Sequence, residues 1–211
     1  MNTLAWLDRL TSIDTTSRNS NLGLIETARD ALKGHGLDPW LNLNAEGTKA
    51  NLFCTLPAQD GATQGGIALS GHTDVVPVDG QNWSSDPFKL TENDGKLYAR
   101  GACDMKGFIA ASLALVPEFM ALPRSKPMHL ALSYDEEISC LGAPFMLAEL
   151  QRRGIRVEGC IVGEPTSMRP VVAHKGLNAY RCRVHGKAAH SSLTTQGCNA
   201  IEHAARLICH I

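Results

Sequence analysis

The sequence predicts an α/β fold in which helices are layered on a sheet. Short apolar runs alternate along the chain with segments of helical periodicity, and turn-forming residues separate them. Several of the apolar runs lack polar alternation, which is typical of strands buried on both faces of a parallel sheet. Histidine and acidic residues at positions 72, 104, 137 and 164 follow one another at steps of 32, 33 and 27 residues, near the usual length of a strand–helix–strand unit.

The first part of the chain contains one predicted helix and two predicted strands. Residues 21–33 carry apolar side chains at helical spacing, with Asn21 as the N-cap and Gly34 as a stop signal. Residues 51–56 and 66–70 are strand-like runs. The turn-rich segment between these two runs suggests that they form adjacent strands joined by a loop.

The same alternation continues after a long polar loop. Residues 107–122 are rich in Ala and Leu and have helical periodicity. A predicted strand at 128–134, a helix at 142–153 and a strand at 159–162 follow. This order predicts further strand–helix–strand units in one layered domain.

The pattern changes near residue 176, where we expect a domain boundary. Residues 177–185 alternate as an exposed strand would, and residues 199–211 place an apolar stripe on a helix without a C-terminal cap. We therefore expect a metal-binding catalytic domain over residues 1–176 and the start of a second domain over residues 177–211. The sequence is expected to end inside that second domain.

The composition is that of an ordinary globular protein. With 44% hydrophobic and 19% charged residues, 211 residues suffice for one good core and part of another. Lys and Arg (20) balance Asp and Glu (21), so no basic field attracts nucleic acid or an anionic membrane, and a small-molecule partner is favoured. Neither a signal peptide nor an apolar run of about 20 residues is evident, so a cytoplasmic location is expected. Seven cysteines without a C-x-x-C motif indicate reduced thiols rather than disulfides.

Histidine and acidic residues occur in four short phrases, three of which close a predicted strand. The carboxyl ends of parallel strands meet at one edge of a sheet, and α/β folds bind their ligands at that edge. We therefore expect these side chains to form one site. They are His72, Asp74, Asp104, Asp135, Glu136, Glu137 and Glu164.

Each phrase also has an ordinary structural interpretation. His72 could be an incidental surface residue beside a capping aspartate, and Asp104 could be the N-cap of the following helix. Lys106 is close enough in sequence to pair with Asp104, which leaves a bridging role for that aspartate open. The acids at 135–137 could form a solvated turn, and Glu164 could be a simple loop residue.

In combination, the four phrases favour a hydrolytic metal site. They supply one imidazole and several carboxylates, which are the ligands expected for Zn²⁺, Co²⁺ or Mn²⁺. A cation would relieve the repulsion among the consecutive acids. Adjacent glutamates could divide the work, one binding the cation and the other taking a proton from water.

These phrases, in this order, resemble a family of co-catalytic di-zinc amidohydrolases and exopeptidases. That family includes acetylornithine deacetylases, succinyl-diaminopimelate desuccinylases, aminoacylases and glutamate carboxypeptidases. The strings WSSDPF (83–88), LYARGACDMKG (97–107), GEPTS (163–167) and PVVAHKG (170–176) are most similar to the acetylornithine deacetylases. The resemblance implies a three-layer zinc-exopeptidase-like domain with a mixed, mostly parallel sheet, followed by the start of an inserted α+β dimerisation domain. It also implies a homodimer for the full-length protein.

The resemblance implies a ligand set for two zinc ions, with cobalt as a possible substitute. His72 and Glu164 would bind the first zinc, Glu137 would bind the second, and Asp104 would bridge the two. In that family a further histidine of the second zinc comes from a C-terminal segment, which lies beyond this chain. We therefore expect weaker binding of the second zinc and little activity of the 211 residues alone.

The resemblance also assigns catalytic residues and a reaction. Asp74 would orient His72, Glu136 would be the general base, and His190 would enter the partner subunit's active site to stabilise the oxyanion. The implied reaction is hydrolysis of N²-acetyl-L-ornithine to L-ornithine and acetate in arginine biosynthesis. The alternatives are desuccinylation of succinyl-diaminopimelate, hydrolysis of another N-acyl amino acid or peptide, and a truncated, non-catalytic metal-binding or interaction protein.

Overall fold

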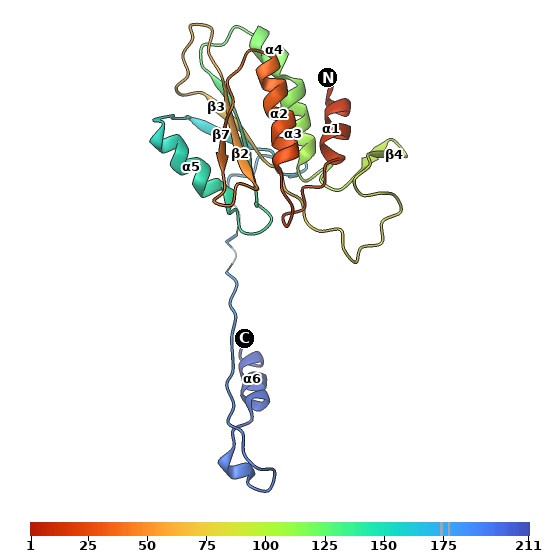
Figure 1. The fold of residues 1–211 in the computed structure, drawn as a ribbon, viewed down its shortest axis with the longest axis vertical. Helices are drawn as coiled ribbons and strands as arrows, with labels where there is room; N and C mark the ends of the chain where they lie inside the picture. Colours follow the sequence, from red (N-terminus) through yellow and green to blue (C-terminus); the bar gives the residue numbers. More distant parts are fainter. Residues whose placement is uncertain (174, 177) are drawn as a thin grey trace. The chain divides into compact units, whose positions relative to one another are not determined.

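A five-stranded mixed sheet organises the first of two structural units in this computed structural model, which describes residues 1–173, 175–176 and 178–211 (Figure 1). The strand order is β1-β2-β6-β3-β7, in which β6, β3 and β7 run parallel and β2 runs antiparallel to β1 and β6. The strands are β1 (Trp40–Leu43), β2 (Ala50–Leu56), β3 (Ile67–His72), β6 (Met128–Ser133) and β7 (Gly159–Val162).

Helices cover both faces of the sheet, so the predicted layered α/β fold is confirmed (Figure 1). The first four helices of this unit pack on one face and bury the main core, which includes Leu10, Ile25, Ile109 and Val116. The fifth helix packs on the other face, where Met146 meets Phe53. The helices of this unit are α1 (Thr3–Thr11), α2 (Leu22–Gly34), α3 (Lys106–Ala114), α4 (Val116–Ala121) and α5 (Gly142–Arg152).

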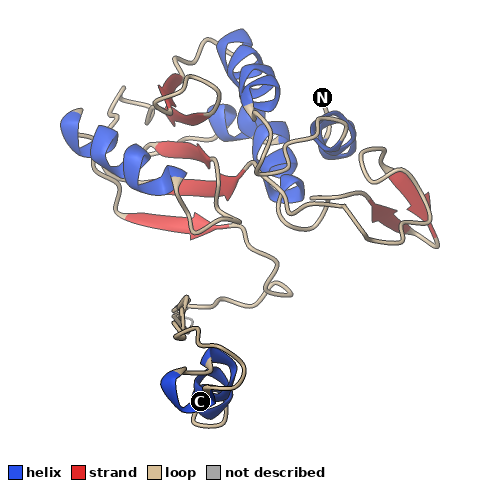
Figure 2. Cartoon of the chain, turned by 60° about the horizontal axis from the view of Figure 1, so that its bottom comes forward, coloured by secondary structure: helices blue, strands red, loops and turns tan. Residues whose placement is uncertain are grey.

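Two smaller elements complete the description. The short strands β4 (Thr91–Asn93) and β5 (Lys96–Tyr98) form a separate hairpin (Figure 2). The second unit, residues 170–211, contains a 3₁₀ turn, η1 (Thr194–Gln196), and the helix α6 (Ala200–Ile208). Asn199 caps α6 by accepting a hydrogen bond from the amide of Ile201. No helix within the described residues has the length and apolar character that a membrane span requires.

Some predicted elements differ from the structure. The predicted neighbours β2 and β3 are not adjacent, because β6 lies between them and pairs with both. The helix predicted over 107–122 is two helices, since the chain turns at Leu115 and Pro117 opens α4. Leu177 lies outside the described residues, and residues 178–185 of the predicted exposed strand have no ladder partner in the part that is described.

The division between the two units falls between Arg169 and Pro170. This division falls a few residues before the predicted boundary at 176. The functions assigned to the two segments, catalysis for the first and dimerisation for the second, stay predictions.

The buried His129 on β6 gives the fold a predicted dependence on pH. Its Nε2 lies 2.8 Å from the carbonyl oxygen of Gly65, and its Nδ1 lies 3.0 Å from the hydroxyl of Thr55. Burial lowers the pKa of His129 below its ordinary value of 6.5. The unfolded chain therefore takes up a proton below about pH 6.5 while the folded chain resists it, so the free energy of unfolding falls on acidification.

The His129→Phe variant is expected to flatten this acid slope by up to about 1.4 kcal/mol per pH unit. Phenylalanine keeps an aromatic ring opposite Phe53, whose centroid lies 5.3 Å from that of His129. Urea unfolding of both proteins at pH 7 and pH 5 measures the difference. If the free energy of unfolding fell equally in both proteins between pH 7 and pH 5, His129 would not be the cause of the pH dependence.

Candidate metal centre

His72 ends β3 with its imidazole buried and its two ring nitrogens in different surroundings. Nδ1 lies 2.9 Å from the main-chain oxygen of Asp74, which fixes Nδ1 as the hydrogen-bond donor. Nε2 faces two carboxylates, at 2.9 Å from Asp104 Oδ1 and 3.6 Å from Glu164 Oε1. A histidine that donates through one nitrogen presents the other to a metal, so His72 has the geometry of a metal ligand.

Four carboxylates converge on this imidazole from three different segments. Asp104 precedes α3, Glu136 and Glu137 follow β6, and Glu164 follows β7. Their ligand atoms form two groups with His72, one with Glu136 and Glu164 and the other with Asp104 and Glu137. Within each group all ligand atoms lie within 4.8 Å of one another. His72 and the three glutamates meet because the parallel strands β3, β6 and β7 all end at the same edge of the sheet, whereas Asp104 comes from the segment just before α3.

The crowded carboxylates favour a cation. Burial raises the pKa of Glu137, and the charge of Asp104 raises it further. Burial likewise raises the pKa of Glu164. Burial opposes protonation of His72, but the carboxylates of Asp74, Asp104 and Glu164 outweigh it and raise the pKa of His72 to about 9. A divalent ion in place of that single proton would neutralise more of the negative charge, so this donor set fits Zn²⁺ or a similar metal.

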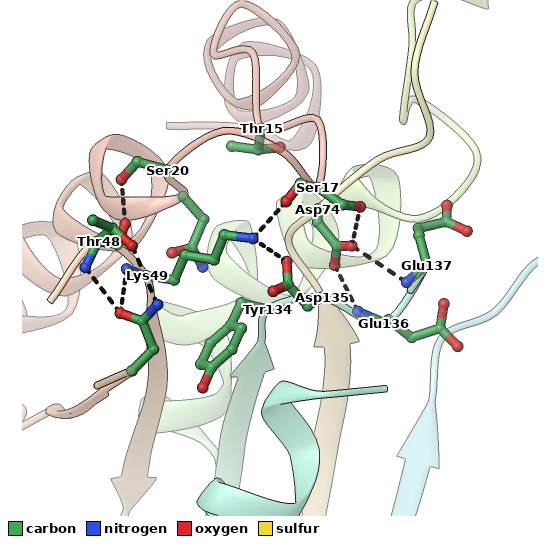
Figure 3. A network of polar contacts seen from close by, with 12 residues as sticks. Thr15, Ser17, Ser20, Thr48, Lys49, Asp74, Tyr134, Asp135, Glu136 and Glu137 are labelled. Carbon is green, nitrogen blue, oxygen red and sulfur yellow. Dashed lines mark hydrogen bonds and ion pairs between the residues drawn. The ribbon is translucent and has the colours of Figure 1, made fainter. Parts of the chain in front are cut away.

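Asp74 holds the loop that carries the two glutamates (Figure 3). Its carboxylate accepts hydrogen bonds from the amides of Glu136, at 3.0 Å, and Glu137, at 3.3 Å, and from the hydroxyl of Ser17, at 2.7 Å. Its Oδ1 lies 3.6 Å from Nδ1 of His72. Burial opposes ionisation of Asp74, but the His72 imidazole, the Ser17 hydroxyl and the Glu136 amide outweigh burial and lower the pKa of Asp74. Asp74 therefore stays ionised and positions the acidic turn, while its main chain contacts the imidazole.

Lys106 does not pair with Asp104, although the two are close in sequence. Its side chain is fully buried, and its Nζ donates to the main-chain oxygens of Leu10, at 3.1 Å, and Ile13, at 2.8 Å. Burial lowers the pKa of Lys106 to about 8. Lys106 thus joins the end of α1 to the start of α3, and the Asp104 carboxylate faces His72 instead.

Within the first unit, the predicted residue Asp135 lies outside the two groups that contain His72. Asp135 turns away from Glu136 and Glu137 and pairs with Lys49 (Figure 3). His190 belongs to the second unit, where its Nδ1 lies 2.8 Å from the hydroxyl of Ser192. The contribution of His190 to a partner's active site stays a prediction.

The fold and the clustered histidine and acidic side chains define an α/β domain with a candidate metal centre. The chain belongs to the peptidase family M20/M25/M40, whose family model matches residues 68–208. The matched range contains every residue that converges on His72.

A relative at the sequence level agrees with this membership, and solved structures share the fold. The chain is 41% identical over 194 residues to an acetylornithine deacetylase of Pasteurella multocida (strain Pm70), a match that covers 92% of the chain and 49% of the relative. It is similar in fold to a tripeptidase of Staphylococcus aureus, with a TM-score of 0.69, 18% identity and coverage of 100% of this chain and 56% of that one. It also resembles human carnosine dipeptidase 1, with a TM-score of 0.62, 24% identity and coverage of 76% and 38%. The chain spans about half the length of the deacetylase that it matches.

Proposed function

We propose that this chain carries the metal-binding part of an enzyme that hydrolyses N²-acetyl-L-ornithine to L-ornithine and acetate. The observation that carries the proposal is the convergence of one imidazole and four carboxylates within a family of metal-dependent hydrolases. The 41% identity to an acetylornithine deacetylase supports this substrate among those of the family.

In the proposed site His72 and Glu164 would hold one zinc, Glu137 would hold a second, and Asp104 would supply a carboxylate to both. The bound metals would lower the pKa of a water molecule and polarise the acyl oxygen. Cobalt could replace zinc, since both accept imidazole and carboxylate ligands. The full-length protein is proposed to be a cytoplasmic homodimer in which residues 177–211 begin the dimerisation domain and His190 stabilises the oxyanion.

Glu136 is the proposed general base. Its carboxylate would accept a proton from the attacking water and return it to the nitrogen of ornithine as the amide bond breaks. The Asp74 carboxylate supports this role because it holds the Glu136 amide at 3.0 Å and so fixes the start of the side chain. The thiol of Cys140 lies 3.4 Å from Glu136 Oε1, which leaves the second oxygen of the base available.

A substrate panel tests the proposed specificity. The absolute rate of the 211 residues alone is expected to be low, but the zinc-loaded chain should hydrolyse N²-acetyl-L-ornithine with a kcat/KM at least about tenfold above that for N-succinyl-LL-diaminopimelate or a dipeptide. Released amine can be measured with a fluorogenic reagent, with protein stripped of metal as the control. Preferential cleavage of another substrate would contradict the acetylornithine assignment, whereas tight zinc binding without any turnover would favour a non-catalytic protein.

A further inference from the structure

The turn after β6 directs three consecutive acids to different sides. Glu136 and Glu137 extend toward the metal centre, whereas the side chain of Asp135 extends the opposite way, toward Lys49 (Figure 3). The backbone of Asp135 has a φ of 56°, which lies in the left-handed region. Residues other than glycine adopt this region at a cost in free energy. Such a conformation persists where surrounding contacts hold it, so the contacts of this turn are informative.

Lys49 holds the turn from one side. Its Nζ contacts Asp135 Oδ1 and also donates to the main-chain oxygen of Ser17. Both members of the ion pair are largely buried, with side-chain exposures of 13% for Lys49 and 10% for Asp135. Lys49 is itself held in place, because its amide donates to Asn44 Oδ1 at 2.9 Å. The pair is therefore a fixed contact between two loops.

Asp74 holds the same turn from the other side through the amides of Glu136 and Glu137. Ser17 connects the two holding points, since its carbonyl accepts from Lys49 and its hydroxyl donates to Asp74 at 2.7 Å. The turn is thus fixed on either side of the Asp135 Cα. Without the Lys49 contact, the Asp74 contacts and the main-chain hydrogen bonds from Leu141 to Asp135 and from Cys140 to Glu136 would remain. These hydrogen bonds hold main-chain atoms, whereas the Lys49 contact holds the Asp135 side chain.

We propose that Lys49 and Asp135 are positioning residues, which act by fixing the turn that aims Glu136 and Glu137 at the metal centre. The inference rests on the proposed function and assigns to the first acid of the turn a task different from that of the other two. Relaxation of Asp135 to a negative φ would rotate the following peptide units. The Glu136 and Glu137 carboxylates would then lose their common direction, and the affinity for metal would fall.

The test compares the wild-type chain with Lys49→Met, Lys49→Arg and the double variant Lys49→Met/Asp135→Asn. The double variant removes both charges, so that no unpaired carboxylate is left buried to unfold the protein. Amide hydrogen exchange of Glu136 and Glu137 is measured without metal, and zinc affinity is measured by competition with a chromophoric chelator. Leu24→Ala, a core change in α2, controls for lost stability, and Lys126→Met, which breaks an exposed ion pair with Glu158, controls for lost charge.

The double variant is expected to exchange the Glu136 and Glu137 amides about tenfold faster than the wild type, as for a locally loosened segment. It is expected to bind zinc about 10- to 100-fold more weakly, as for the loss of a group that supports a metal ligand. Lys49→Arg should remain close to the wild type, and both controls should keep their zinc affinity.

Two results would overturn the inference, and they are distinguishable. A wild-type chain that binds no zinc would overturn the proposed function and, with it, the role of the pair. A wild-type chain that binds zinc, together with a double variant unchanged in both amide exchange and affinity, would overturn the positioning role alone.

Discussion

Replacement of Glu136 by glutamine is expected to lower the rate of N²-acetyl-L-ornithine hydrolysis by about 10²- to 10⁴-fold, the usual contribution of a general base. Glutamine has nearly the same size as glutamate and can keep its place on the turn held by Asp74. Its amide cannot accept a proton from water, so the loss should fall on kcat rather than on KM. Steady-state kinetics of the zinc-loaded proteins measure the effect.

Measurement of zinc affinity distinguishes a general base from a metal ligand at Glu136. Glu136 lies in one of the two groups with His72 and Glu164, so it could also coordinate a metal. As a base it should leave zinc affinity nearly unchanged when replaced, whereas joint loss of zinc and activity would identify it as a ligand. Full activity in Glu136→Gln would contradict both roles. Glu118→Gln, an exposed change on α4, is the matched control.

Replacement of Asp104 by alanine is expected to weaken zinc binding by more than about 100-fold. Mutation of a group that only supports a metal ligand already lowers metal affinity by about 10- to 100-fold. Asp104 Oδ1 lies 2.9 Å from Nε2 of His72, and its side chain is 50% exposed. The fold should therefore tolerate the change while the proposed bridge between the two metals is lost. Zinc titration of the purified variant, with urea unfolding to check its stability, measures both effects.

The control for this variant is Asp30→Ala, an exposed aspartate on α2 that pairs with Arg29. It removes the same charge without touching the centre and should bind zinc as the wild type does. Unchanged zinc affinity in Asp104→Ala would exclude this aspartate as a bridging ligand.

The sequence predicted which side chains lie close together better than it predicted the order of the strands. Local patterns identify strand ends, and parallel strands bring their ends together, so the convergence on His72 follows from local signals. The order of strands depends on contacts between distant segments, which is why the insertion of β6 between β2 and β3 was missed. The helix α1 was also missed, although Trp6, Leu7 and Leu10 have helical spacing and Asn2 provides a cap.

Residue type alone could not separate the three acids of the turn. Asp135, Glu136 and Glu137 carry the same charge, and the positive φ of Asp135 decides which way its side chain points. Its partner Lys49 lies 86 positions earlier in the chain, and no local motif connects the two. Lys106 is a similar case, because its proximity to Asp104 in sequence suggested an ion pair, whereas the fold buries it against α1.

Anomalous X-ray scattering at the zinc absorption edge, from crystals grown with zinc, tests the metal centre most directly. The proposed site predicts a peak bound by Nε2 of His72 with Asp104 and Glu164, and a second, weaker peak beside Glu137. Zinc found only at other side chains, with no peak beside His72, would contradict a metal centre at this edge of the sheet.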